Sequence, residues 1–89
     1  MFTGIIQALG TIQSLDHRGE DIKLTVSSEK LDMSDVALGD SIATNGVCLT
    51  VTDFGTDYYC ADVSAETIRY TGFANYKPGS TVNLEKAMR

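Results

Sequence analysis

The chain has 89 residues, 43% hydrophobic and 21% charged, a composition typical of one globular domain. Seven basic residues against 12 acidic ones give a net charge of −5. The basic residues are scattered, whereas nucleic-acid binding needs them clustered, so we expect no nucleic-acid partner. No apolar run approaches the roughly 20 residues of a spanning helix, so we expect no membrane partner. The first residues lack the basic region of a secretory signal, and we therefore expect a cytoplasmic location.

Two cysteines, Cys48 and Cys60, and one histidine, His17, lack the spacing of a zinc site, so we expect no metal. A Cys48–Cys60 disulfide could form in principle, but a cytosolic setting argues against it. From composition alone, both thiols are interpreted as buried, small hydrophobic groups.

The first half of the chain predicts two strands and two short helices. Residues 4–15 are β-prone and are interrupted at Gly10, where a bulge or bend would fit. The polar segment 17–21 predicts a hairpin connection. Residues 22–27 alternate apolar and polar side chains, which is typical of a half-buried strand. Short helices are expected over residues 29–32 and 34–38, with Gly39 ending the second.

The centre of the chain predicts a β-hairpin. Residues 40–44 and 47–54 form its strands, and Asn45-Gly46 forms a two-residue type I′ turn, which needs positive φ at both positions. A hairpin of this kind fixes which residues of the returning strand share a face.

The rest of the chain predicts a strand over 57–63, a helix over 64–69, a turn over 77–80 and a strand over 81–86 in which Val82 and Leu84 face inward. Ser64 is the expected N-cap of the helix. Six short strands favour an all-β, six-stranded Greek-key barrel with short helices. A five-stranded oligonucleotide-binding barrel fits less well, because it would need a basic, aromatic face.

Strand alternation over residues 47–54 separates a hydrophobic face from a polar one. The first face holds Val47, Leu49 and Val51, and the second holds Cys48, Thr50 and Thr52. If the first fills the core, Thr50 could hydrogen-bond a polyhydroxylated chain and Cys48 could contact a ring. Threonines are also common on the solvated face of a strand, and alternation alone favours that interpretation.

Two further positions carry polar groups. Ser41 could approach Cys48 and Thr50 across the hairpin, but the chain has no Gly-x-Ser-x-Gly motif that would indicate a hydrolase and no phosphate-binding loop. In residues 62–67 a strand ends and a helix begins, so free backbone N–H groups could donate to a ligand. An ordinary capped helix explains this segment equally well.

Four segments together resemble the N-terminal lumazine-binding barrel of riboflavin synthase: Met1-Phe2-Thr3-Gly4-Ile5-Ile6, Asn45-Gly46-Val47-Cys48-Leu49-Thr50-Val51-Thr52, Glu66-Thr67-Ile68, and Lys77-Pro78-Gly79 leading into Val82-Asn83-Leu84-Glu85. The resemblance covers essentially the whole chain, with the segments in order at matching separations.

The resemblance implies an enzyme that transfers a four-carbon unit between two molecules of 6,7-dimethyl-8-ribityllumazine, giving riboflavin and a pyrimidinedione. It implies no metal or redox cofactor. In this family each chain has two similar barrels, three chains assemble, and the reacting pair lies between barrels of neighbouring chains. Holding two rings face to face would supply much of the catalysis.

The resemblance also implies the residues of the site. Ser41 and Cys48 would give polar assistance to the reaction. The substrate would contact Gly4, Ile5, Ile6, Cys48, Leu49, Thr50, Asp62, Val63, Ser64, Ala65, Glu66, Thr67 and Ile68.

The sequence ends at Arg89, where the family continues into its second barrel, and the family's histidine has no match, because His17 is expected in a hairpin loop. We therefore expect residues 1–89 to form one barrel that binds ligand but is catalytically incomplete, and that could pair as a homodimer. A non-catalytic lumazine-binding protein is the alternative. The cysteine at position 48 favours the enzyme family. A generic interaction barrel is a third interpretation.

Overall fold

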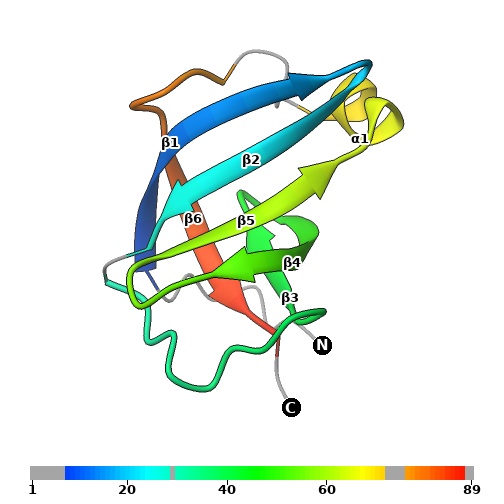
Figure 1. The fold of residues 1–89 in the computed structure, drawn as a ribbon. Coiled ribbons are helices and arrows are strands. Elements are labelled where there is room, and N and C mark those ends of the chain that lie inside the picture. The colour runs from blue at the N-terminus through cyan, green and yellow to red at the C-terminus, as the bar shows by residue number, and fades with distance from the viewer. Residues whose placement is uncertain (1–7, 29, 72–75, 88–89) are drawn as a thin grey trace.

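A computed structural model describes residues 8–28, 30–71 and 76–87 of the chain. Six antiparallel strands close into a barrel in the order β1-β2-β5-β4-β3-β6, with one short helix (Figure 1). The elements are β1 (Ala8–Arg18), β2 (Asp21–Ser27), β3 (Ser41–Thr44), β4 (Val47–Phe54), β5 (Tyr58–Val63), α1 (Ala65–Tyr70) and β6 (Thr81–Lys86).

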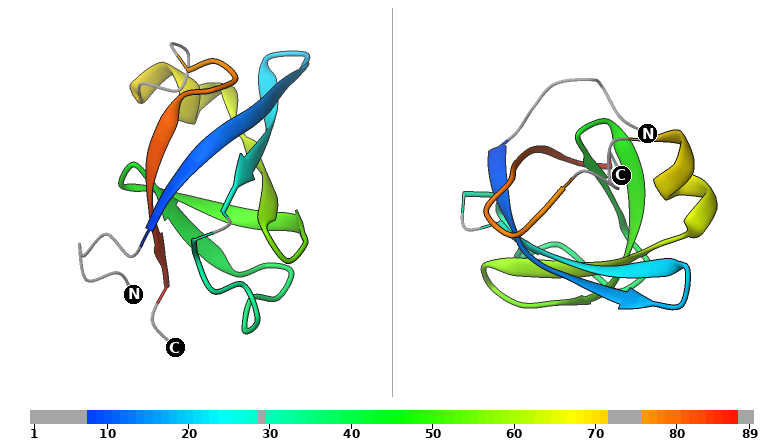
Figure 2. Two further views of the ribbon diagram at one scale, coloured as in Figure 1. Left: turned by 90° about the vertical axis from the view of Figure 1, so that its left-hand side faces the viewer. Right: turned by 90° about the horizontal axis from the view of Figure 1, so that it is seen from above.

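The topology is a Greek key, as the sequence predicts. Strands β3, β4 and β5 follow one another as hairpins, and β6 then returns past α1 to pair with β3 on one side and β1 on the other. Figure 2 shows the barrel from the side and from above, with β6 completing the wall between β1 and β3. Since every described strand has two neighbours, the barrel leaves no strand edge open among them.

The core is filled by the inward-facing side chains of the strands, as alternation requires. Val82 and Leu84 of β6 are both buried, which confirms their predicted orientation. The most deeply buried large side chains are Ile12, Leu24, Val26, Ile42, Val51, Tyr59, Val63, Val82 and Leu84.

One polar pair crosses this core. The hydroxyl groups of Thr44 and Tyr59 lie 2.5 Å apart, within hydrogen-bond distance, and both residues are fully buried. Burial raises the pKa of the Tyr59 phenol well above its ordinary value, and the hydrogen bond with Thr44 offsets only part of that effect. Each hydroxyl group therefore gives the other a partner inside an apolar interior.

The prediction of a bulge at Gly10 was wrong. Gly10 pairs regularly with Val82, and the register of β1 shifts two residues later, between Ile12 and Ser14. A Cβ atom at Gly10 would lie 2.6 Å from Leu84 Cδ1 and 2.7 Å from the Ser27 carbonyl oxygen. Glycine is needed here because neighbouring groups approach the backbone closely.

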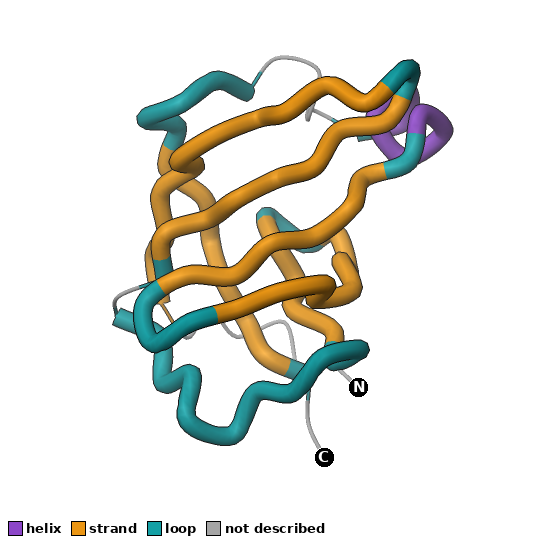
Figure 3. The backbone as a smooth tube through the Cα atoms, viewed as in Figure 1, coloured by secondary structure: helices purple, strands orange, loops and turns teal. Residues whose placement is uncertain are grey.

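The two helices expected between β2 and β3 were also wrong. Apart from residue 29, which is outside the described residues, this segment is a series of turns, drawn as loop in Figure 3. The Asp32 side chain accepts a hydrogen bond from the Ser34 backbone N–H, and the Asp40 side chain accepts one from Ala37. Such local side-chain bonds compete with the helical pattern, and so short a helix has little cooperativity to resist them.

The connection between β1 and β2 is shorter than predicted. His17 lies in β1 and pairs with Ile22, and only residues 19–20 form the turn. By contrast, the Asn45-Gly46 turn is confirmed, because φ is +50° at Asn45 and +81° at Gly46. The helix α1 and its N-cap Ser64 are confirmed as well.

Candidate functional site

The β3–β4 hairpin carries three of the predicted site residues on its outer face. Ser41 of β3 pairs directly with Thr50 of β4, and Cys48 lies two residues before Thr50 in β4, opposite Ala43. Cys48 and Thr50 are exposed, whereas Ser41 is half-buried. The hairpin therefore brings two hydroxyl groups and a free thiol to one surface.

The second group of predicted residues lies where β5 ends and α1 begins, and we call residues 62–68 the β5–α1 junction. The Ser64 hydroxyl accepts a hydrogen bond from the Thr67 backbone N–H at 3.2 Å and donates one to Thr67 Oγ1 at 3.0 Å. Because the Thr67 hydroxyl accepts from Ser64, its own proton is available to another acceptor. Asp62 and Glu66 are exposed, and Glu66 lies in the first turn of the helix.

The hairpin and the junction lie on adjacent strands. Strand β4 pairs with β5 only from Val51 onward. The pair of Val51 with Ala61 is therefore the one at the end of the ladder that lies nearest Thr50. Thr50 and Asp62 are the next residues on their strands, and both are exposed. Strand β4 bends away from β5 beyond this pair, so the two groups of polar residues flank the point at which the strands separate (Figures 1 and 3).

Some predicted contacts involve residues whose side chains face the core. Leu49 is 4% exposed and Val63 is 1% exposed, so each would have to reach a ligand through its main chain. The expected free N–H groups at the start of α1 are partly used, because Ala65 donates to Asp21 Oδ1 and Thr67 donates to Ser64. The predicted residues Gly4, Ile5 and Ile6 lie outside the described residues.

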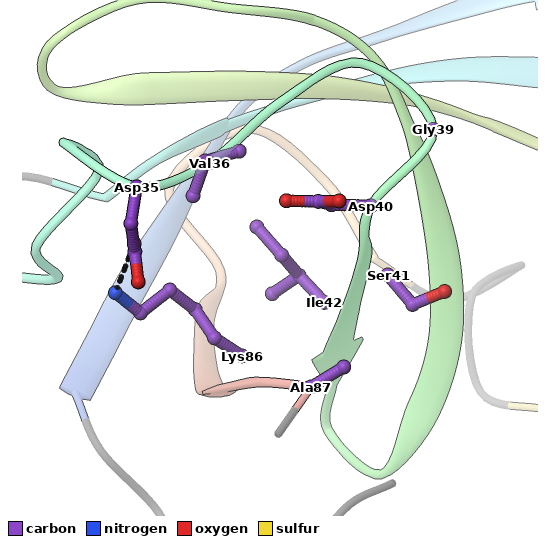
Figure 4. A pocket seen from close by; sticks show the side chains of 8 residues that line it. All are labelled: Asp35, Val36, Gly39, Asp40, Ser41, Ile42, Lys86 and Ala87. Carbon is purple, nitrogen blue, oxygen red and sulfur yellow. Dashed lines mark hydrogen bonds and ion pairs between the residues drawn. The ribbon is translucent and has the colours of Figure 1, made fainter. Parts of the chain in front are cut away.

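A cavity of about 250 Å³ lies beside Ser41, and its lining is shown in Figure 4. The lining consists of Asp35, Val36, Gly39, Asp40, Ser41, Ile42, Lys86 and Ala87. The Ser41 hydroxyl points away from Ile42, toward the outer face of the hairpin (Figure 4). Ser41 lines this cavity, but neither Cys48 nor Thr50 is among its lining residues.

The Lys86 side chain closes one side of this cavity. Its Nζ atom donates to the Asp32 carbonyl oxygen at 2.5 Å and to Asp35 Oδ1 at 2.8 Å, the second contact being an ion pair. The hydrogen bond from Lys86 lowers the pKa of the Asp35 carboxyl group. Two other cavities, of about 270 and 510 Å³, lie elsewhere and are lined neither by Cys48 nor by the β5–α1 junction.

Three residues near the candidate site make long-range contacts that were not predicted from the sequence. Asn45 contacts Tyr76 and Asn83, Asp21 contacts Ala65, and Lys86 contacts the loop before β3. Each contact joins residues more than 30 positions apart. The motif Asn-Gly predicts the turn, but no local pattern in the sequence predicts these hydrogen-bond partners.

Within the described residues, no group of three or more His, Cys, Asp or Glu side chains could hold a metal ion. In the same part of the chain, no helix has the length and apolar character needed to cross a membrane.

The chain combines a closed six-stranded antiparallel barrel with a polar hairpin face beside a strand-to-helix junction. The family model described as "Lumazine binding domain" matches residues 3–87, and the chain belongs to that family.

The chain is similar in sequence to curated riboflavin synthases, which confirms the resemblance seen in the sequence. It is 52% identical over 88 residues to riboflavin synthase of Photobacterium phosphoreum and 50% identical to that of Bacillus subtilis (strain 168). These matches cover 99% of this chain and 40% of each relative, so the chain spans about two-fifths of their length.

Solved structures confirm the fold. A crystal structure of LumP complexed with 6,7-dimethyl-8-(1'-D-ribityl) lumazine matches with a TM-score of 0.89 at 21% identity, over 97% of this chain and 49% of that one. A crystal structure of LumP complexed with riboflavin matches with a TM-score of 0.87 at 29% identity, over 97% of this chain and 46% of that one.

Proposed function

We propose that this chain binds 6,7-dimethyl-8-ribityllumazine and riboflavin as one barrel of a riboflavin synthase. The observation that carries the proposal is the family match over residues 3–87, together with about 50% identity to riboflavin synthases over the same region. LumP, a structural relative, has been crystallised with both ligands.

The geometry supports a division of the site between a ring and a ribityl chain. A ribityl chain carries several hydroxyl groups and needs hydrogen-bonding partners, which Thr50, Ser64, Glu66 and Thr67 offer. Cys48 offers a polarisable group to the ring. Leu49 and Val63 would contribute main-chain groups, because their side chains fill the core.

In the proposed reaction, one bound lumazine loses a proton from its 7-methyl group, a nucleophile adds to the other ring, and a four-carbon unit is then transferred between the two. Ser41 and Cys48 would assist these polar steps, and no cofactor would take part. The outer face of the hairpin is open, so a single barrel would hold one lumazine on one side only. Catalysis would require a second barrel to place the other lumazine within reach.

The partner would therefore be another barrel of the same kind, in the trimer of two-barrel chains typical of riboflavin synthases, or in a homodimer of residues 1–89. By themselves, these 89 residues would bind ligand with little or no turnover. We propose the cytoplasm as the compartment, since the described structure keeps Cys48 and Cys60 as free thiols, which suit a reducing environment.

The test is a titration of the purified 89-residue chain with 6,7-dimethyl-8-ribityllumazine, followed by absorbance and fluorescence. We expect a saturable shift and no riboflavin formation. The matched ligand is 6,7-dimethyllumazine, which lacks the ribityl chain and should bind more weakly. No spectral change with either ligand would refute the proposal. Riboflavin forming at a rate proportional to protein would show that these residues assemble a working site unaided.

A non-catalytic binding protein is the second candidate, and the structural similarity to LumP favours it. The retained Cys48 favours the enzyme. The two can be separated by adding a second riboflavin synthase barrel. Turnover that depends on both barrels supports the enzyme, whereas binding without turnover in the mixture supports the binding protein.

A further inference from the structure

Asn45 makes three hydrogen bonds to parts of the chain remote from its own hairpin. Its backbone N–H donates to the Asn83 carbonyl oxygen at 2.8 Å, and its Oδ1 atom accepts from the Asn83 backbone N–H at 2.6 Å. Its Nδ2 atom donates to the Tyr76 hydroxyl at 2.6 Å. This residue also holds the positive φ of +50° that the turn requires.

These contacts extend the β3–β6 ladder by one step. The ladder pairs Ile42, Ala43 and Thr44 with residues of β6, and Thr44 opposite Leu84 is its last pair. At Asn45 the backbone turns away from β6, and the side-chain oxygen accepts the hydrogen bond from the Asn83 N–H group. The side-chain amide thus joins the tip of the hairpin to β6 and to the segment that precedes it.

The Asn45-Gly46 turn is followed directly by β4, whose residues Cys48 and Thr50 are proposed to contact the ligand. Over residues 47–50, β4 is paired with β3, and its ladder with β5 begins only at Val51. The position of Cys48 and Thr50 therefore depends on β3 and on the turn. A side chain that fixes the turn against β6 fixes the first half of β4 as well.

We propose that Asn45 is a positioning residue for the ligand site, acting through its hydrogen bonds to Asn83 and Tyr76 to hold Cys48 and Thr50 in place. This inference rests on the proposed function. Asn45 itself lies at the turn and acts through the strand that follows it.

The experiment compares three single variants of the 89-residue chain and the double variant Asn45→Gly/Tyr76→Phe. Asn45→Gly keeps a residue that tolerates positive φ but removes both side-chain bonds, and Tyr76→Phe removes one bond from the other end. Ile12→Val is the control, because it lowers stability by shortening a buried core side chain far along the chain from the hairpin. For each variant we would measure the Kd for 6,7-dimethyl-8-ribityllumazine and the amide hydrogen exchange of residues 47–50, at a temperature where all are folded.

We expect Asn45→Gly to raise the Kd about tenfold and Tyr76→Phe about threefold, as the net strengths of the lost hydrogen bonds suggest. The double variant should be no weaker than Asn45→Gly alone, because both changes remove the same bond. Exchange at residues 47–50 should accelerate in both variants, and Ile12→Val should leave the Kd unchanged.

A lower stability with an unchanged Kd in Asn45→Gly would overturn the proposal and leave Asn45 a structural residue only. Hydrogen exchange needs no ligand, so it separates this inference from the proposed function. If the unsubstituted chain binds no lumazine, the proposed function and the positioning role both fail. If it binds lumazine but exchange at residues 47–50 does not respond to the substitutions, only the positioning role fails.

Discussion

The Oδ1 atom of Asp21 accepts a hydrogen bond from the backbone N–H of Ala65 at 2.9 Å, although the two residues are 44 positions apart. Asp21 begins β2, and Ala65 begins α1. The first turn of the helix is therefore capped twice, by Ser64 from within the junction and by Asp21 from a neighbouring strand.

Replacing Asp21 should loosen the start of α1. Asp21→Ala leaves the Ala65 N–H without this acceptor, and we expect a loss of about 1 kcal/mol in the free energy of unfolding, as for other helix caps. Asp21→Asn retains an acceptor oxygen and should lose less than half as much. Urea unfolding of the two variants measures the difference, and equal losses would contradict the assignment of the lost stability to this hydrogen bond.

Two threonines on the same face of β4 offer a matched pair for testing the ligand site. Thr50 and Thr52 are both exposed, but Thr50 lies opposite Ser41, whereas the Thr52 hydroxyl donates to the Cys60 carbonyl oxygen. Thr50→Val should weaken lumazine binding about fivefold, since one hydrogen bond to the ligand is lost. Thr52→Val should change the affinity less than twofold. Equal effects in a fluorescence titration would contradict the placement of the site.

The buried pair Thr44 and Tyr59 should show strong energetic coupling. Tyr59→Phe leaves the Thr44 hydroxyl unsatisfied in the core and should cost about 1–3 kcal/mol. Adding Thr44→Val to that variant should cost little more, because no polar group then remains unpaired. A double-mutant cycle by urea unfolding gives the coupling, and additive losses would argue against the hydrogen bond.

The buried Tyr59 phenol should make the folded protein less stable at alkaline pH. Burial raises the pKa of the Tyr59 phenol above its ordinary value of 10.0, so the folded protein keeps this proton after the unfolded chain has lost it. The unfolded state then binds fewer protons, and the free energy of unfolding must fall as the pH rises above about 10. Tyr59→Phe should show a shallower decline over that range in unfolding experiments. A decline of equal slope would exclude Tyr59 as its source.

Removing the Lys86 ammonium group should change the pKa of two neighbouring carboxyl groups by different amounts. The pKa of Asp35 is lowered mainly by its hydrogen bond from Lys86, whereas the pKa of Asp32 is lowered mainly by hydrogen bonds from Ser34. In Lys86→Met, the pKa of Asp35 should therefore return toward 3.8 while that of Asp32 moves less. Titration of the carboxyl carbons by NMR resolves both. The stabilisation from the Lys86–Asp35 pair is present above pH 3.8 and is lost as the pH falls through the lowered pKa.

The parts of the fold that were predictable from the sequence depend on short-range patterns. Val47, Leu49 and Val51 alternate with polar residues and do face the interior to differing degrees, and Asn45-Gly46 forms the expected turn. These features follow from strand periodicity and from backbone sterics, which act over a few residues.

The sequence-based predictions were wrong where contacts outside the local pattern determine the structure. Gly10 is explained by the approach of Leu84 and Ser27, which no local pattern encodes, and the segment before β3 forms turns because Asp32 and Asp40 bond to nearby backbone groups. The same limit applies to the site. Ser41 opposite Thr50 follows from the hairpin register, but the contacts of Asn45 and Asp21 join distant segments and required the structure.

The place of β6 in the barrel has a consequence for how the chain folds during its synthesis. Strand β6 leaves the ribosome after the other five strands of this barrel, yet it is the partner that both β1 and β3 need, and Ala8 pairs with Leu84 across nearly all of these 89 residues. Until β6 emerges, β1 and β3 each present an unpaired edge that another nascent chain could join. Contacts so distant in sequence also close slowly. The interval before closure is therefore when this domain is most exposed to aggregation.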